Sequence, residues 1–219
     1  METTVKDVMT TQVVVVRRGA TFKEMAATLR RFRVSAFPVV DENGKVIGVV
    51  SEADLLAKEA LADHGRVDGL LHHREVRKAE GLTAGDLMTH PAVTVRPEDT
   101  VEQAARLMCT LRIKRLPVVN AGGGLVGLIT RTDLLAVYDR PDEDIRADVE
   151  GVILHEFLED PRQFAVGVKD GVVTVQGSPE TVALGHHIVR KIRRVPGVVA
   201  VRDRLSYPEE SPVVTAPLF

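Results

Sequence analysis

The stretch that decides the fold is written twice: Gly48–Leu56 reads GVVSEADLL, and Gly127–Leu135 reads GLITRTDLL, 79 positions later. Shifting the chain by 79 positions aligns residues 5–57 with residues 84–136 without a gap, and 18 of the 53 aligned pairs are identical. Self-similarity at one fixed spacing indicates an internal duplication. Two copies are too few for a solenoid, and they suit a pair of units packed face to face about a pseudo-twofold axis.

Each copy predicts the same order of elements, β-α-β-β-α. Thr21 and Thr100 open capping boxes, with Glu24 and Gln103 three residues later, so an amphipathic helix should follow each threonine. The second helix of each copy should begin at Ser51 or Thr130. The expected strands of the first copy are rich in β-branched residues: Val13–Val16, Phe37–Val40 and Val46–Val50. A turn at Asn43-Gly44 should join the last two. In the second copy we expect strands at Ala92–Val95 and at the two segments that align with the later strands of the first.

This order of elements resembles the CBS domain, and two copies in tandem resemble the CBS pair, or Bateman module. The resemblance rests on the Met-Thr start of each copy, the Pro-Val-Val strand and the closing Gly-x-x-Ser/Thr-x-x-Asp motif. It covers roughly residues 3–138. It implies an α/β (α+β) fold with one CBS repeat in residues 1–60, a charged connector in 61–82 and a second repeat in 83–140.

The repeated motif has a structural and a ligand-binding interpretation. Ser51 with Asp54, and Thr130 with Asp133, fit capping boxes that need no ligand. A strand leading into a helix N-terminus also presents free N–H groups to an anion. Gly48 and Gly127 precede these starts, and glycine inside a strand often marks a close approach by backbone or ligand.

The CBS resemblance implies that the aspartate binds the ribose of an adenosine ligand (AMP, ADP, ATP or a relative), with the Ser or Thr near the ribose or phosphate. Adenine would lie between strands of the two repeats. The residues implicated in this way are Ser51, Asp54, Thr130 and Asp133.

The two copies differ in charge around this motif. Lys114 and Arg115 precede the second Pro-Val-Val strand, and basic residues there can reach a phosphate, whereas solvated surface is the alternative interpretation. The first copy has Ser35 and Ala36 at these positions. Position 52 is Glu, which repels phosphate, and the aligned position 131 is Arg. We therefore expect the second copy to supply the better phosphate-binding half.

Residues 141–208 predict a separate small domain of order α-β-β-α-β. A helix with one apolar face should start at Asp142 and stop at Pro161, and two strands should follow, joined at Asp170-Gly171. Ser178-Pro-Glu180 should open a second helix, and Val198–Leu205 should be the last strand. The apolar face of the first helix consists of Ile145, Val149, Val152, Ile153 and Phe157. Residues 142–207 resemble a BON domain, which implies contact with phospholipid surfaces or protein partners. The tail, residues 209–219, is rich in proline and predicted to be disordered.

Several function classes are disfavoured by composition. A net charge of −2 and the absence of Trp argue against nucleic-acid binding, and no apolar run reaches the roughly 20 residues of a membrane span. The basic stretch Arg190–Arg194 is the only feature that points to an anionic membrane surface, and we interpret it as the solvent face of a helix. Adjacent histidines (His72-His73 and His186-His187) make poor metal chelates. With a single cysteine and no signal peptide, we expect a cytoplasmic protein.

The sequence favours a regulatory protein without catalytic activity, because no nucleophile elbow, P-loop or zinc-hydrolase motif occurs. We expect a homodimer that requires no cofactor, senses an adenine nucleotide between its repeats, and relays it to the BON-like domain or to a protein partner. The alternative is an interaction protein without a ligand, whose CBS pair dimerises and whose BON-like domain contacts a membrane or a protein.

Overall fold

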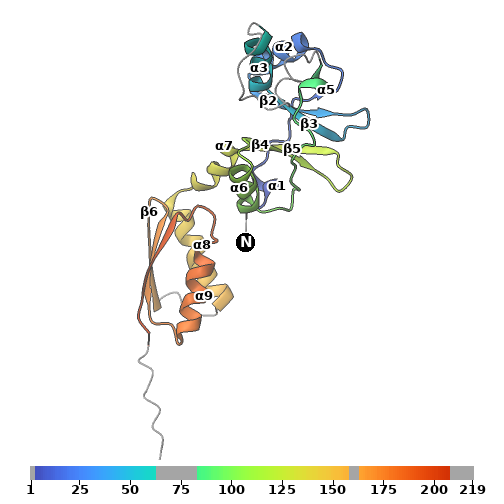
Figure 1. Ribbon diagram of the computed structural model, residues 1–219. Coiled ribbons are helices and arrows are strands. Elements are labelled where there is room, and N and C mark those ends of the chain that lie inside the picture. The colour runs from blue at the N-terminus through green and yellow to red at the C-terminus, as the bar shows by residue number, and fades with distance from the viewer. Residues whose placement is uncertain (1–2, 63–82, 158–162, 208–219) are drawn as a thin grey trace, which may run out of the picture. The chain divides into compact units, whose positions relative to one another are not determined.

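The computed structural model describes residues 3–62, 83–157 and 163–207, and the chain divides into two compact units (Figure 1). One unit, Thr4–Leu134, holds both copies of the repeat, and the other extends from Leu135. Within the described ranges, no helix combines the length and the apolar content needed to cross a bilayer.

The predicted order β-α-β-β-α is confirmed in the first repeat, and the second repeat follows it except that an isolated bridge replaces its opening strand. The first copy consists of β1 (Val16–Arg17), α2 (Phe22–Phe32), β2 (Ala36–Val40), β3 (Val46–Ser51) and α3 (Glu52–Ala62). The second copy consists of α6 (Val101–Thr110), β4 (Arg115–Val119), β5 (Leu125–Thr130) and α7 (Arg131–Leu135). The opening strands are shorter than predicted: β1 has two residues, and its counterpart is a single parallel bridge between Val95 and Val118. Thr10 bridges Leu128 of the other repeat, so the chain ahead of β1 serves to join the repeats.

The predicted capping boxes set the start of both long helices. The Thr21 hydroxyl accepts a hydrogen bond from the Glu24 backbone N–H at 3.3 Å, and Glu24 Oε2 accepts one from the Thr21 N–H at 2.7 Å. Thr100 and Gln103 form the same pair of bonds in the second copy. Each box satisfies donors that a helix N-terminus otherwise leaves unpaired.

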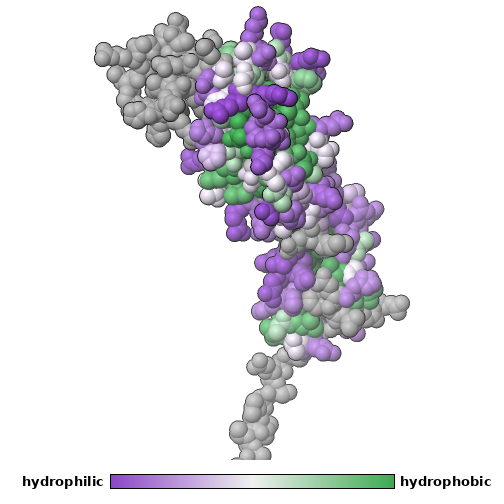
Figure 2. Space-filling view, turned by 90° about the vertical axis from the view of Figure 1, so that its right-hand side faces the viewer, coloured by the Kyte–Doolittle hydropathy of each residue, from purple (hydrophilic) through white to green (hydrophobic). Residues whose placement is uncertain are grey.

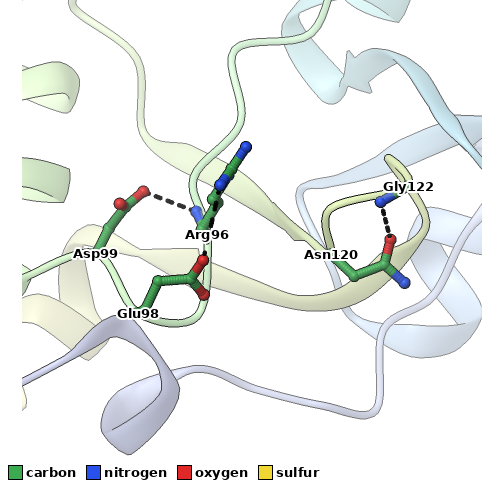
Figure 3. A network of polar contacts seen from close by, with 5 residues as sticks. All are labelled: Arg96, Glu98, Asp99, Asn120 and Gly122. Carbon is green, nitrogen blue, oxygen red and sulfur yellow. Dashed lines mark hydrogen bonds and ion pairs between the residues drawn. The ribbon is translucent and has the colours of Figure 1, made fainter.

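Both hairpin turns are built by an aligned Asx side chain. Asp41 Oδ1 accepts hydrogen bonds from the backbone N–H groups of residues 43 and 45. Asn120 Oδ1 accepts them from the N–H groups of Gly124 and Gly122, and the bond to Gly122 is drawn in Figure 3. Gly44 (φ 76°) and the aligned Gly123 (φ 82°) adopt the left-handed conformation that such turns require. The two turns therefore have one design, although the sequences Glu-Asn-Gly and Ala-Gly-Gly look different.

These turns also meet each other. The Val46 N–H donates to the Gly123 carbonyl at 3.2 Å, and the Leu125 N–H donates to the Gly44 carbonyl at 3.4 Å. The two bonds join aligned positions, as expected for two copies facing one another across a pseudo-twofold axis.

The short helix that opens each copy packs into the core of the other copy. Helix α1 (Val5–Val8) places Val5 in the second repeat's core beside Ala104 and Met108. Helix α5 (Ala84–Leu87) places Ala84 and Leu87 in the first repeat's core. Neither core is complete without the other copy, so the pair forms one cooperative unit.

The second unit has the predicted α-β-β-α-β order. After η1 (Ala136–Tyr138) it consists of α8 (Asp142–Phe157), β6 (Phe164–Lys169), β7 (Val172–Gly177), α9 (Val182–Ile192) and β8 (Ala200–Leu205). Strand β7 pairs antiparallel with β6 and parallel with β8, and both helices cover one face of this sheet (Figure 1). The core between helices and sheet contains Ile145, Val149, Ile153, Phe164, Val173, Val175, Ile188 and Ile192.

Local features of this unit confirm some predictions and correct others. Asp170 (φ 51°) and Gly171 (φ 72°) form the predicted hairpin turn. The second helix does not start at Ser178: the Thr181 hydroxyl accepts the Leu184 N–H at 3.1 Å, and α9 begins at Val182. The cap is therefore Thr181, directly before the first helical residue. The prediction placed it at Ser178 because a proline follows there, and proline is common in the first turn of a helix. The structure does not describe several predicted features. These are the side chain of Phe157, the helix stop at Pro161, the connector beyond residue 62 and the tail from residue 209. The BON resemblance stays a prediction.

Candidate functional site

A cavity of about 290 Å³ opens between the two repeats, within the unit Thr4–Leu134. This volume is at the lower end of the range of small-molecule pockets. Its lining residues come from both copies: Ser35, Val49, Ser51, Glu52, Ala53, Asp54, Thr89, Ala92, Val93, Arg112, Ile113, Lys114 and Arg115. It therefore combines an apolar part with hydroxyls and charges of both signs.

The first copy contributes the start of α3. Asp54 Oδ2 accepts hydrogen bonds from the Ser51 backbone N–H (2.8 Å) and from the Ser51 hydroxyl (2.7 Å). The Glu52 N–H donates to the Ser35 carbonyl at 3.0 Å. These bonds confirm the half of the predicted capping box in which Asp54 binds back to Ser51, and they hold both residues together at the pocket wall.

The second copy contributes the predicted residues Lys114 and Arg115. Arg115 Nη2 donates a hydrogen bond of 2.9 Å to the Ser35 hydroxyl of the first copy. Burial lowers the pKa of the Arg115 guanidinium, and the nearby Glu52 carboxylate acts in the opposite direction. The guanidinium stays protonated at neutral pH, so the pocket holds a partly desolvated cation.

The other predicted pair, Thr130 and Asp133, does not line this pocket. It forms the same cap at the start of α7, where Asp133 Oδ2 accepts from the Thr130 N–H and hydroxyl at 2.7 Å each. The guanidinium of Arg131 donates two hydrogen bonds to the Ile113 carbonyl, at 3.2 and 3.1 Å. The sequence-based expectation grouped Lys114 and Arg115 with Asp133, and the pocket instead groups them with Asp54. Because the copies face each other, a loop of one reaches the helix start of the other.

The two strand glycines have another role than contact with a ligand. A Cβ on Gly48 would lie 2.5 Å from Met88 Sδ, and a Cβ on Gly127 would lie 2.5 Å from Met9 Sδ. Each methionine belongs to the short helix segment contributed by the other copy. A close approach does occur at both glycines, and the nearest group is a methionine side chain of this chain, where the sequence had indicated backbone or a ligand.

Sequence reasoning missed several lining residues, notably Thr89 and Arg112. Both are identical between the copies, matching Thr10 and Arg33, and both arginines adopt the left-handed conformation (φ 51° and 54°). A non-glycine residue in that conformation is uncommon. Identity between the copies was the signal that could have drawn attention to these positions.

Metal binding has no support among the residues that the structure describes, since no cluster of three or more His, Cys, Asp or Glu side chains occurs there. His186 and His187 are exposed on α9, and His72-His73 lies outside the described residues. Ile192 is buried, whereas Arg190, Arg193 and Arg194 are exposed, as expected for the solvent face of an amphipathic helix.

A family model, described as the CBS domain, matches residues 5–60 and 84–140, which is slightly more than half of the chain. The chain is 33% identical over 134 residues to the chloroplastic CBS domain-containing protein CBSX1 of Arabidopsis thaliana, covering 55% of this chain and 57% of that protein. It is 35% identical over 130 residues to the CBS domain-containing protein YhcV of Bacillus subtilis, covering 59% and 81%.

Among solved structures, a crystal structure of CBSX2 in complex with AMP is 34% identical, with a TM-score of 0.51. It covers 61% of this chain and 94% of the solved one. The curated relatives CBSX1 and CBSX2 extend beyond the shared region, since the matches span 57% and 62% of their lengths. The aligned lengths of these matches correspond to the length of the duplicated region.

Proposed function

The chain belongs to the CBS domain family, and on this premise we propose that its two repeats form a regulatory module that binds an adenosine-containing nucleotide in the pocket between them. The observation that carries the proposal is the convergence of the Ser51–Asp54 helix start with Lys114 and Arg115 in one cavity. The solved relative CBSX2 in complex with AMP supports the choice of ligand class.

The lining fits the parts of such a nucleotide. Val49, Ala92, Val93 and Ile113 offer an apolar surface for adenine. The Asp54 carboxylate can accept hydrogen bonds from ribose hydroxyls while it caps the helix, because each carboxylate oxygen has more than one lone pair. Lys114 and Arg115 can bind phosphate, Arg115 with two N–H groups at once. AMP, ADP, ATP and related adenosine compounds are the candidates.

In this proposal the nucleotide acts as a signal. It would favour one arrangement of the two repeats, and that arrangement would be transmitted to the C-terminal unit, which we compare to a BON domain, or to a protein partner. A cytoplasmic location and a homodimer complete the proposal.

The competing proposal is an interaction module that binds no ligand. Asp54 and Asp133 both accept hydrogen bonds from the residue that precedes their helix, so the repeated motif has a structural use without a nucleotide. The CBS pair would then serve dimerisation, and the C-terminal unit would contact a protein or a membrane surface.

Thermal unfolding of the full chain separates the two proposals. The melting temperature is measured with adenosine, AMP, ADP and ATP at millimolar concentration. A ligand present at a hundredfold excess over its dissociation constant stabilises the folded state by about 2.7 kcal/mol. If none of the four raises the melting temperature, the nucleotide proposal is rejected and the interaction module stands.

A further inference from the structure

Glu52 is an anion in a place where a phosphate-binding pocket would ordinarily have none. It is the first residue of α3, it lines the cavity, and it is exposed to it. The cavity also holds Arg112, Lys114 and Arg115. A phosphate drawn to these cations therefore comes close to a carboxylate that repels it.

Glu52 is also connected to the most enclosed of these cations. Its backbone N–H donates to the Ser35 carbonyl at 3.0 Å, and the Ser35 hydroxyl accepts from Arg115 at 2.9 Å. Burial lowers the pKa of Arg115, and attraction to the nearby Glu52 carboxylate offsets part of that effect. A ligand phosphate must share the Arg115 charge with Glu52.

We propose that Glu52 sets the phosphate preference of this pocket, so that it accepts a nucleoside monophosphate and discriminates against the triphosphate. This inference rests on the function proposed above. Lys114 and Arg115 can balance the charge of a monophosphate despite its repulsion from Glu52. Every added phosphate brings more negative charge into a cavity of about 290 Å³, and the repulsion from Glu52 grows with that charge.

The other copy has the opposite charge at the aligned position. The Arg131 guanidinium donates two hydrogen bonds to the Ile113 carbonyl and is held by its own repeat. The duplicated scaffold therefore tolerates either charge at the first position of this helix, and an acidic residue is not required there for folding. This makes Glu52 suitable for substitution.

The test is titration calorimetry of the full chain with adenosine, AMP and ATP in buffer without divalent cations. The wild type should bind AMP at least about tenfold more tightly than ATP, which corresponds to about 1.4 kcal/mol. Glu52→Gln should leave the affinity for adenosine unchanged within about twofold, tighten AMP by about fivefold and tighten ATP by about 25-fold, as expected for a repulsion that scales with charge.

Glu42→Gln is the matched control. Glu42 is exposed in the first hairpin turn and does not line the cavity, so its loss changes the net charge equally and should alter none of the three affinities. A wild type that binds ATP as tightly as AMP overturns the inference, and so does a Glu52→Gln protein that tightens adenosine and ATP by the same factor. In both cases the proposed function still stands if the wild type binds AMP and Asp54→Asn weakens that binding. If the wild type binds none of the three compounds, the proposed function itself is rejected.

Discussion

Arg115 donates a 2.9 Å hydrogen bond to the Ser35 hydroxyl, 80 residues earlier in the chain, and this bond joins the two repeats at the pocket wall. Ser35 aligns with Lys114 and Arg115 aligns with Ala36, so the bond occurs between positions that differ between the copies. The two copies therefore share one backbone arrangement, and the sequence differences at these positions place Lys114 and Arg115 in one pocket.

Arg115→Gln should therefore weaken phosphate binding and spare nucleoside binding. A charge-assisted hydrogen bond contributes about 1.5–3 kcal/mol, so the AMP affinity should fall by roughly 10- to 150-fold. Adenosine has no phosphate and should bind as before. Calorimetric titration of both compounds measures this, and equal losses for AMP and adenosine would show that Arg115 only supports the fold.

Asp54→Asn and Asp133→Asn form a matched pair, because both side chains cap a helix and only Asp54 lines the pocket. Asparagine retains some capping ability, so each variant should lose at most about 1 kcal/mol of unfolding free energy. Asp54→Asn should weaken AMP binding by roughly 10- to 150-fold through loss of its bonds to ribose. Asp133→Asn should change this pocket little. The opposite ranking would assign the nucleotide to the other helix start.

Much of the unit Thr4–Leu134 could be predicted from the sequence, because its determinants are local. The capping boxes at Thr21 and Thr100 and the glycine turn at Gly44 were all read correctly. The distribution of residues between sites could not be predicted. In the linear sequence Lys114 and Arg115 belong to the same copy as Asp133, and only the packing of one copy against the other brings them to Asp54.

The strand glycines illustrate the same limit. Glycine at positions 48 and 127 correctly indicated a close approach. Its cause is the exchange of α1 and α5 between the cores, which brings Met9 and Met88 against the opposite β-strands. That exchange depends on contacts between residues about 40 to 120 positions apart, which no local pattern encodes.

Gly48→Ala should destabilise the CBS pair by about 1–3 kcal/mol, because the added Cβ would lie 2.5 Å from Met88 Sδ and the core is already filled. The double substitution Gly48→Ala/Met88→Ala should recover part of the strain while leaving a cavity. Gly19→Ala is the control, since nothing lies within 4 Å of its Cβ. Chemical denaturation measures all three, and equal stability of Gly19→Ala and Gly48→Ala would contradict the assigned role.

The proposed homodimer needs an apolar surface, and the helix faces around Leu29 and Met108, on which we based this expectation, do not supply it. Met108 is buried in its own repeat and Leu29 is partly buried in the other, so neither is left uncovered. Phe32, Leu56 and Leu111 are exposed by 51%, 65% and 47%, and hydrophobic residues do reach the surface between hydrophilic ones in Figure 2.

We expect light scattering at micromolar concentration to give the mass of a dimer for the wild type. Leu56→Asp should shift it toward the monomer, because a charge at a buried apolar contact is costly. Lys23→Asp, on the exposed side of α2, serves as the control. A monomeric wild type would remove the homodimer from the proposal.

The C-terminal unit should fold when it is expressed alone, and the structure indicates at which residue such a fragment should begin. Its core of Ile145, Val149, Phe164, Val175 and Ile188 is complete within the unit from Leu135. Arg140 donates hydrogen bonds to the Pro196 carbonyl (2.8 Å) and to Asp148 Oδ2 (2.9 Å), and it lies just outside the boundary of residue 141 predicted from the sequence.

A fragment of residues 135–208 should therefore be more stable than one of residues 141–208 by about 1.5–3 kcal/mol, the usual contribution of a hydrogen bond from a charged donor. Arg140→Gln in the longer fragment should reproduce most of that loss, because it removes the guanidinium and leaves residues 135–139 in place. Dispersed amide resonances of the longer fragment and urea midpoints of all three proteins test this. If the longer fragment lacks dispersed resonances, this unit depends on the CBS pair for its fold, and the idea of a separate domain that receives the nucleotide signal fails with it.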